Sequence, residues 1–497
     1  MPAYKYTVLS NTTIGTMMGA LDSSIVLIAL PTILKKLPGT GADEGLWIIM
    51  GYMLITSTFV LNFGRIGDMF GRARTYNIGF AVFTIGSFLC SLSQTGLQLI
   101  IFRLLQAFGS ALLWANSGAL ITDAFPLNER GRALGLNQAS LVSGQVVGLV
   151  LGGILTATLG WRSIFWVNVP IGIFATVWAH YKLREITALK KKQKLDIWGN
   201  LTFAGGLSIL LLGVTLGALE SWSPLHFAMI GIGGILMVAF TFIETRVSEP
   251  MFDLSLFKLK VFSAGNLAGM LSGLARGAFT FMMSFYLQGV LGDSALTAGI
   301  LIIPLSISVA IVGPLSGILS DKYGSFYFAT AGLTVTGFAF LIMHQIPAEI
   351  SYALLVVPMV LMGTGWGLFG SPIRSETLSS VPAARRGVGN SVTMTTMNVG
   401  WLVSLAVSIL IISSSVSHSL VLSVFGGGTI AASSASTQIT NITSFMNGLH
   451  NVYALSAVLA FIAVIPLLLG FRGIRSREDR AKKEMIPDSS AATADAV

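Results

Sequence analysis

The sequence is poor in charge and contains almost no cysteine. Only 10% of its 497 residues are charged, whereas soluble domains contain about 25%, so most of the surface cannot face water. The single cysteine, Cys90, lies in an apolar stretch. One cysteine excludes an intramolecular disulfide. Phosphate-binding loops, metal-ligand clusters and nucleophile elbows are also missing between the apolar stretches, so we expect no enzyme, no bound metal and no cofactor.

Apolar residues make up 53% of the chain and fall into stretches long enough to cross a bilayer, which takes about 20 residues. We identify fourteen, near residues 8–34, 46–63, 75–93, 97–121, 133–159, 161–181, 197–218, 225–244, 262–289, 296–318, 326–346, 351–371, 388–413 and 451–471. The first is too long for a signal-peptide core, so we expect it to be retained. The sequence predicts an all-α polytopic membrane protein.

The distribution of Lys and Arg orients these spans, because both residues accumulate in cytoplasmic loops. With a cytoplasmic amino terminus, all but a few of the 30 Lys and Arg residues fall inside. The exceptions are Lys35, Lys36 and Arg162 outside, and Arg103 and Arg276 within spans. We therefore expect a multi-pass protein of the cell membrane with both termini cytoplasmic. The net charge of +9 reflects this topology and does not indicate a nucleic-acid partner.

Two motifs in the loops recur at nearly the same offset. The pattern G-x-x-x-D-x-x-G covers 64–71 and again 317–324, an offset of 253, and a Pro-to-Arg-Gly segment covers 126–131 and again 382–387, an offset of 256. Two parallel halves joined by an inserted pair of spans explain these offsets. We predict a six-helix bundle over 1–181, a cytoplasmic linker with two inserted helices over 182–245, a second six-helix bundle over 246–475 with an external loop near 414–448, and a disordered cytoplasmic tail over 476–497.

At these residues the sequence resembles the major facilitator superfamily, and within it the fourteen-span drug:proton antiporter family of multidrug efflux type. The segment 64–74 is similar to the loop signature G-x-L-A-D-R-x-G-R, with Met69 at the usual arginine. Segments 21–31, 103–109 and 160–172 resemble the first-, fourth- and sixth-span motifs, with Ala107 replacing a glycine. The segment 144–153 resembles the antiporter signature G-x-x-x-G-P-x-x-G-G, with Leu149 where the proline belongs.

Three charged residues lie deep within predicted spans, where a charge costs roughly 2.5–3.5 kcal/mol on insertion scales. At a rise of about 1.5 Å per residue, Asp22, Arg103 and Arg276 fall at similar depth, and an offset of 254 makes Arg276 the repeat partner of Asp22. Our hypothesis is that all three face a central cavity, where Asp22 takes up and releases the coupling proton. The alternative is a static ion pair that holds helices together.

The repeated loop motif places glycines around an acidic residue, close to basic residues. Glycine allows a tight turn, and Asp68 can pair with Arg72 or Arg130 or cap a helix. We interpret the motif as a latch that holds one face closed, with an ordinary positive-inside loop as the alternative. The predicted gate residues are Gly64, Gly67, Asp68, Gly71, Arg72, Arg130 and Asp321.

The fifth span carries glycines at a four-residue spacing that makes a smooth groove for a neighbouring backbone. These are Gly144, Gly148, Gly152 and Gly153. Antiport and ordinary helix packing explain the groove equally well. Aromatic and amide side chains within spans suit apolar or cationic guests, although packing roles explain most of them. The candidates for a substrate cavity are Trp114, Asn116, Trp366 and Asn398.

The resemblance and the two parallel halves together predict a secondary active transporter that expels drugs or other small amphipathic molecules in exchange for protons, by alternating access and as a monomer. Its partners are a small-molecule substrate, protons and the lipid bilayer. Leu149 keeps open the alternative of a proton-coupled importer of a small nutrient. A membrane receptor or sensor without transport is the remaining alternative, but it would not need paired gate motifs.

Overall fold

The structure, a computed structural model, describes residues 2–126, 130–186, 196–219, 222–247, 250, 252–382, 386–416, 420, 430 and 435–470. These residues form helices and short connections, with no strand among them. The predicted tail over 476–497 lies outside the described residues. A single long apolar stretch crosses lipid as a helix, because each of its backbone N–H and C=O groups must find a hydrogen-bond partner within the segment.

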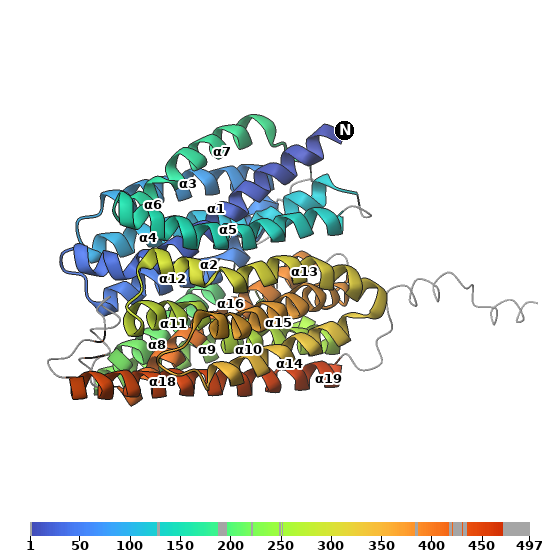
Figure 1. The fold of residues 1–497 in the computed structure, drawn as a ribbon. Helices are drawn as coiled ribbons and strands as arrows, with labels where there is room; N and C mark the ends of the chain where they lie inside the picture. The colour runs from blue at the N-terminus through green and yellow to red at the C-terminus, as the bar shows by residue number, and fades with distance from the viewer. Residues whose placement is uncertain are drawn as a thin grey trace, which may run out of the picture.

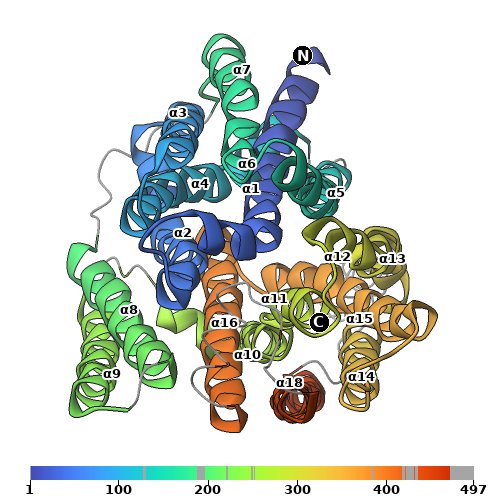
Figure 2. The same cartoon turned by 60° about the vertical axis from the view of Figure 1, so that its left-hand side comes forward.

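The first seven helices form one bundle (Figures 1 and 2). They are α1 (Pro2–Lys36), α2 (Ala42–Phe70), α3 (Arg72–Leu92), α4 (Gly96–Ala124), α5 (Arg130–Thr158), α6 (Ser163–Trp166) and α7 (Asn168–Lys182). Helices α6 and α7 together fill the sixth predicted span. Two further helices, α8 (Ile197–Leu219) and α9 (Pro224–Arg246), pack against each other beside the bundle, where α8 contacts α2.

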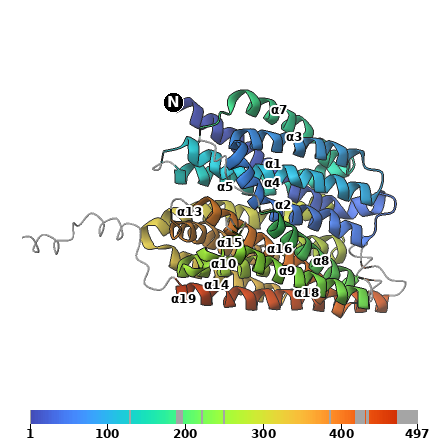
Figure 3. The ribbon, with the colours of Figure 1, turned by 180° about the vertical axis from the view of Figure 1, so that it is seen from behind.

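The second bundle contains the remaining helices, which lie together on the other side of α2 in Figure 2. They are α10 (Lys260–Arg276), α11 (Phe279–Phe285), α12 (Ala295–Leu301), α13 (Ile303–Tyr323), α14 (Ser325–Met343), α15 (Tyr352–Ser379), α16 (Arg386–Ser415), α18 (Ala435–Ile462) and α19 (Val464–Gly470). The first residues of α1 and the last of α19 lie at the same end of the molecule (Figures 1 and 3).

Twelve helical segments of the described chain are long and apolar enough to cross a membrane. The two other predicted spans correspond to α2, which contains the described apolar segment Glu44–Val60, and to α10 with α11, which are separated by two residues. The protein is therefore a multi-pass membrane protein of two helical bundles with an inserted helix pair. The count of fourteen spans stays a prediction.

One element boundary differs from the prediction. Residues 435–448, expected in an external loop, form the first half of α18. Their composition of Ser, Thr, Asn and Gly gave the expectation of a loop, but Phe445, Met446 and Leu449 are buried against the bundle. This apolar face stabilises the helix, because tertiary packing outweighs weak helix propensity.

The inserted pair is attached to the end of α2 that carries the gate motif. Asp196 caps α8, because its Oδ1 accepts a hydrogen bond of 2.8 Å from the Gly199 N–H. At the end of α9, Glu244 Oε2 accepts one of 3.1 Å from the Phe252 N–H. Arg65 of α2 donates to the carbonyl of Pro250 in the same connection. These contacts join α2, α9 and the segment that leads into the second bundle.

Candidate functional site

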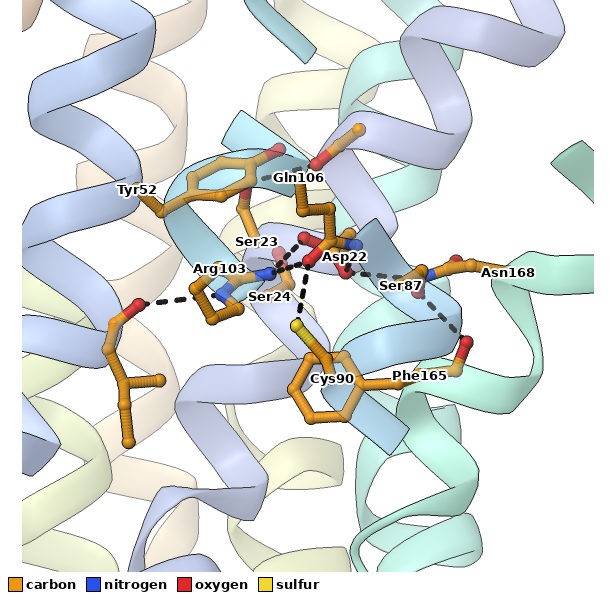
Figure 4. A network of polar contacts seen from close by, with 12 residues as sticks. Asp22, Ser23, Ser24, Tyr52, Ser87, Cys90, Arg103, Gln106, Phe165 and Asn168 are labelled. Carbon is orange, nitrogen blue, oxygen red and sulfur yellow. Dashed lines mark hydrogen bonds and ion pairs between the residues drawn. The ribbon is translucent and has the colours of Figure 1, made fainter. Parts of the chain in front are cut away.

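Asp22 lies in the middle of α1 and receives hydrogen bonds from three side chains of two other helices, α4 and α7 (Figure 4). Arg103 Nη1 of α4 lies 2.6 Å from Asp22 Oδ2 and forms an ion pair with it. Gln106 Nε2, one turn further along α4, donates to Asp22 Oδ1 at 2.9 Å. Asn168 Nδ2 at the start of α7 donates to the same oxygen, also at 2.9 Å. The carboxylate therefore has a donor on each oxygen.

Arg103 is held in place from several sides. Its Nη1 also donates to Gln106 Oε1 at 2.7 Å, and its guanidinium carbon lies 4.2 Å from the centre of the Tyr52 ring. The Nε group contacts the Ile48 carbonyl of α2 at 3.4 Å. The i, i+3 spacing of Arg103 and Gln106 puts both side chains on one face of α4, which is how a single helix supplies two donors to Asp22.

The pair is sealed from solvent in this conformation. Asp22 has 0% and Arg103 2% of its surface exposed, so neither lines an open cavity. A buried pair of opposite charges persists only when its remaining polar groups find partners. Asn168 extends the network, since its Nδ2 also contacts Ser87 Oγ at 3.2 Å, and Ser87 donates to the Phe165 carbonyl at 2.9 Å.

Arg276, predicted to face the same cavity as this pair, lies in the other bundle. Arg276 is the last residue of α10 in the second bundle, and its guanidinium carbon lies 5.0 Å from the centre of the Trp366 ring. It makes no hydrogen bond or ion pair with Asp22. The offset of 254 explains why Arg276 lies apart from Asp22, because residues related by the repeat occupy equivalent positions in different bundles.

The gate motif is mostly helical. Helix α2 continues to Phe70, and the chain turns at one residue, Gly71, whose φ of 107° favours glycine. Gly67 lies against α4, where a methyl group added to it would come 1.9 Å from Asn116 Oδ1. Gly64 faces α16, with its nearest neighbour, Ser391 Oγ, at 3.8 Å from such a methyl group. The side chains of Asp68, Arg130 and Asp321 lie outside the described part of the structure.

Arg72 pairs with Asp123, which is not among the predicted gate residues. Its Nη1 lies 2.8 and 2.7 Å from the two carboxylate oxygens of Asp123, the last acidic residue of α4. In the second bundle Gly324 repeats the turn with a φ of 94°, and Ser325 Oγ donates to Glu376 Oε2 at 3.3 Å. Asp123 and Glu376 are 253 residues apart, like the loop motifs, and this shared offset was the signal available in the sequence.

The glycines of α5 bring its backbone close to α1. Added methyl groups at Gly144, Gly148 and Gly152 would lie 2.5, 2.6 and 3.0 Å from carbonyl oxygens of α1. These oxygens belong to Met17, Leu21 and Ile25. The last two positions flank Asp22, so α5 packs directly behind the residue that carries the buried carboxylate.

The same segment of α5 also contacts the second bundle. A methyl group at Gly153 would lie 2.4 Å from the Cα of Leu296 in α12, and one at Gly299 would lie 2.6 Å from the carbonyl oxygen of Leu149. Leu149, which stands where the antiporter signature has proline, is buried with 3% exposed. Helix α5 is thus wedged between α1 of its own bundle and α12 of the other.

The four predicted cavity residues do not come together. Trp114 and Asn116 are on α4, and Asn116 is buried and donates to the Leu112 carbonyl at 2.9 Å. Trp366, on α15, lies beside Arg276 of α10. Asn398 is half-buried on α16. Asn116 therefore serves the packing of α2 on α4, whereas Trp366 contacts a buried charge.

Known proteins similar to this chain are membrane transporters. The family model described as Major Facilitator Superfamily matches residues 12–405. The chain is 33% identical over 402 residues to the riboflavin transporter RibZ of Clostridioides difficile, covering 81% of this chain and 87% of that protein. The multidrug resistance protein Stp of Mycobacterium tuberculosis is 31% identical, with 80% and 74% covered. The tetracenomycin C resistance and export protein of Streptomyces glaucescens is 28% identical, with 79% and 73% covered.

Solved structures share the fold at low sequence identity. An auto-inhibited POT family peptide transporter superposes with a TM-score of 0.65 at 17% identity, covering 95% of this chain and 98% of the other. A bacterial homolog of the human lysosomal transporter Spinster, in an inward-facing and unoccupied conformation, gives 0.65 at 16% identity, with 94% and 97% covered.

Proposed function

Because the chain belongs to the major facilitator superfamily, and is therefore a transporter and not an enzyme, we propose that it expels drugs or other small amphipathic molecules in exchange for protons. The two bundles alternate in exposing a central site to either side of the membrane. The protein works without a cofactor, as a monomer in the cell membrane, with both termini cytoplasmic. In this proposal helix α2 and the α10–α11 pair add two spans to the twelve long apolar helices, making fourteen.

The observation that supports proton coupling most directly is the buried pair of Asp22 and Arg103, 2.6 Å apart. When Asp22 takes up a proton, Arg103 loses its counter-charge, and an unpaired buried charge is strongly destabilising, by about 3–5 kcal/mol. Protonation therefore favours any conformation in which water or another group reaches Arg103. Such a link between protonation and conformation is what exchange of a substrate for a proton requires.

The packing of α5 supports a route from this pair to the interface between bundles. Helix α1 carries Asp22 and meets the glycines of α5 at Leu21 and Ile25. Helix α5 in turn meets α12 at Leu296 and Gly299. A shift of α1 that accompanies protonation of Asp22 would displace α5 and with it the contact between the bundles.

Flux through purified protein in liposomes tests this function. With an imposed pH gradient, we expect tetracenomycin C to move against its own gradient, and an uncoupler to abolish that movement. Asp22→Asn should reduce gradient-driven flux to the level of empty liposomes. Glu349→Gln is the matched control, because it removes an exposed carboxylate. Gradient-driven flux that survives in Asp22→Asn would exclude the coupling role, and binding without flux would favour a receptor.

A proton-coupled importer of a small nutrient is the second candidate. It is favoured by the similarity to a protein named as a riboflavin transporter and by Leu149 at the proline position of the antiporter signature. Cells that express the protein discriminate between the two. An exporter lowers the cellular content of tetracenomycin C and raises resistance to it, whereas an importer raises the accumulation of riboflavin and confers no resistance.

A further inference from the structure

Arg276 carries a buried positive charge that no acidic side chain balances among the residues that the structure describes. Only 7% of its surface is exposed, and its Nε has no hydrogen-bond partner. Across the described ranges of the chain, no carboxylate forms an ion pair with it. An isolated charge at this depth is costly to keep, so its retention calls for a partner that is present during part of the protein's working cycle.

The buried arginine of the first bundle, Arg103, shows what a balanced site contains. Arg103 has the carboxylate of Asp22 at 2.6 Å and the amide oxygen of Gln106 at 2.7 Å. Arg276 instead faces the rings of Trp366 and Phe369, whose centres lie 5.0 and 5.9 Å from its guanidinium carbon. Aromatic faces attract a cation more weakly than a carboxylate does in a buried site, so Arg276 remains uncompensated.

Unsatisfied hydrogen-bond donors lie on two of the helices that pack against α10, namely α15 and α16. The indole Nε1 of Trp366 on α15 is buried without an acceptor, and so is that of Trp401 on α16. Trp401 contacts the last turn of α10, since a methyl group added at Gly273 would lie 3.0 Å from its Cδ1. All of these unsatisfied groups are donors, and what they lack is an acceptor.

The helix is also interrupted at this point. Helix α10 ends at Arg276, and α11 begins at Phe279 after two residues. The N–H of Ala278 in this break is held by Ser404 Oγ of α16 at 3.0 Å. Discontinuous helices at membrane depth are typical of substrate sites in transporters, because irregular backbone is tolerated there only where it is buried in protein or lines a cavity.

We propose that Arg276 binds an anionic group of the transported substrate, a carboxylate on an aromatic body that packs against Trp366 and Phe369. This inference rests on the proposed transport function and adds a substrate class to it. A guanidinium forms two parallel hydrogen bonds with a carboxylate, and a buried positive charge repels cations. The site therefore selects organic anions over the cationic guests that the aromatic residues alone would suit.

A series of probes with one ring system and different charges tests this assignment. The probes are 1-pyrenecarboxylate, neutral 1-pyrenecarboxamide and cationic 1-pyrenemethylammonium. Binding to the full-length protein in a nonionic detergent is followed by energy transfer from tryptophan, with protein-free micelles subtracted. No gradient is applied, so this experiment measures binding independently of flux. A failure to observe transport in liposomes would therefore not change the result of the binding experiment.

We expect the parent protein to bind the carboxylate at least tenfold more tightly than the cation. Arg276→Gln should lower the affinity for the carboxylate by roughly tenfold or more, as expected for the loss of a charged hydrogen-bonding partner. It should not lower the affinity for the cation. Arg276→Lys should retain part of the preference. Equal affinity of the parent protein for all three probes would overturn the proposal, and this outcome can be measured without any variant. An equal effect of Arg276→Gln on the affinity for each probe would also overturn it.

Discussion

Asp22 and Arg103 depend on each other, because among the described residues of the first bundle each forms its ion pair with the other alone. Their 2.6 Å contact is completed by Gln106 and Asn168, which supply donors to the remaining carboxylate oxygen. Removing one charge from such a pair is far more harmful than removing both. Loss of either charge should therefore destabilise the conformation in which the pair is buried.

This dependence predicts the outcome of a double-mutant cycle. Arg103→Met should lower stability by about 3–5 kcal/mol, because it leaves the Asp22 carboxylate buried and unpaired. Adding Asp22→Asn should recover most of that loss. Thermal unfolding of the purified proteins in detergent measures both effects. Strictly additive losses for the two substitutions would show that the residues do not depend on each other.

At the level of helices, the glycines of α5 decide how closely two neighbours approach. The backbone of α1 lies where the side chain of any larger residue would be, at Gly144, Gly148 and Gly152. Interfaces of this type use small residues because close backbone contact stabilises helix pairs where lipid removes the hydrophobic driving force. The groove thus has a packing role whatever part α5 plays in exchange.

A pair of substitutions on this one helix isolates the effect of close approach. Gly148→Ala places a methyl group 2.6 Å from the Leu21 carbonyl oxygen, so α1 and α5 must separate, and we expect a loss of about 1–3 kcal/mol, typical of overpacking. Gly135→Ala, also on α5, meets nothing within 4 Å and should be neutral or stabilising through higher helix propensity. Melting temperatures of the two variants give the comparison, and equal effects would contradict the packing argument.

On the scale of the whole molecule, the contact of α5 with α12 joins the two bundles near Gly153 and Gly299. Alternating access requires interfaces of this type to form and separate as complete units, since packed surfaces have a few discrete arrangements and do not deform continuously. A contact that depends on a glycine is sensitive to a single added methyl group.

Gly299→Ala should therefore shift the protein toward conformations in which this interface is open. Its methyl group would lie 2.6 Å from the Leu149 carbonyl oxygen. Spin labels at Leu159→Cys and Ile307→Cys, both at exposed positions, report the distance between the bundles, and the native Cys90 is buried. We expect longer distances to gain population in Gly299→Ala and not in the control Gly370→Ala, which meets nothing within 4 Å. Identical distributions would show that the contact does not control the closed state.

Sequence alone determined those properties that are set along a single helix. The spans follow from apolar length, since a backbone in lipid must satisfy its own hydrogen bonds. The shared depth of Asp22 and Arg103, and the repeat that relates Gly71 to Gly324, follow from counting residues. The glycine groove of α5 was visible in the spacing of its residues.

The tertiary structure decided which of these features meet. It joined Asp22 with Asn168 and Arg72 with Asp123, and it left Arg276 with aromatic neighbours in the other bundle. It also made residues 435–448 helical, against their composition. The physical reason is that depth and spacing are properties of one helix, whereas the direction in which a side chain points, and the partner it finds, depend on how several helices pack around it.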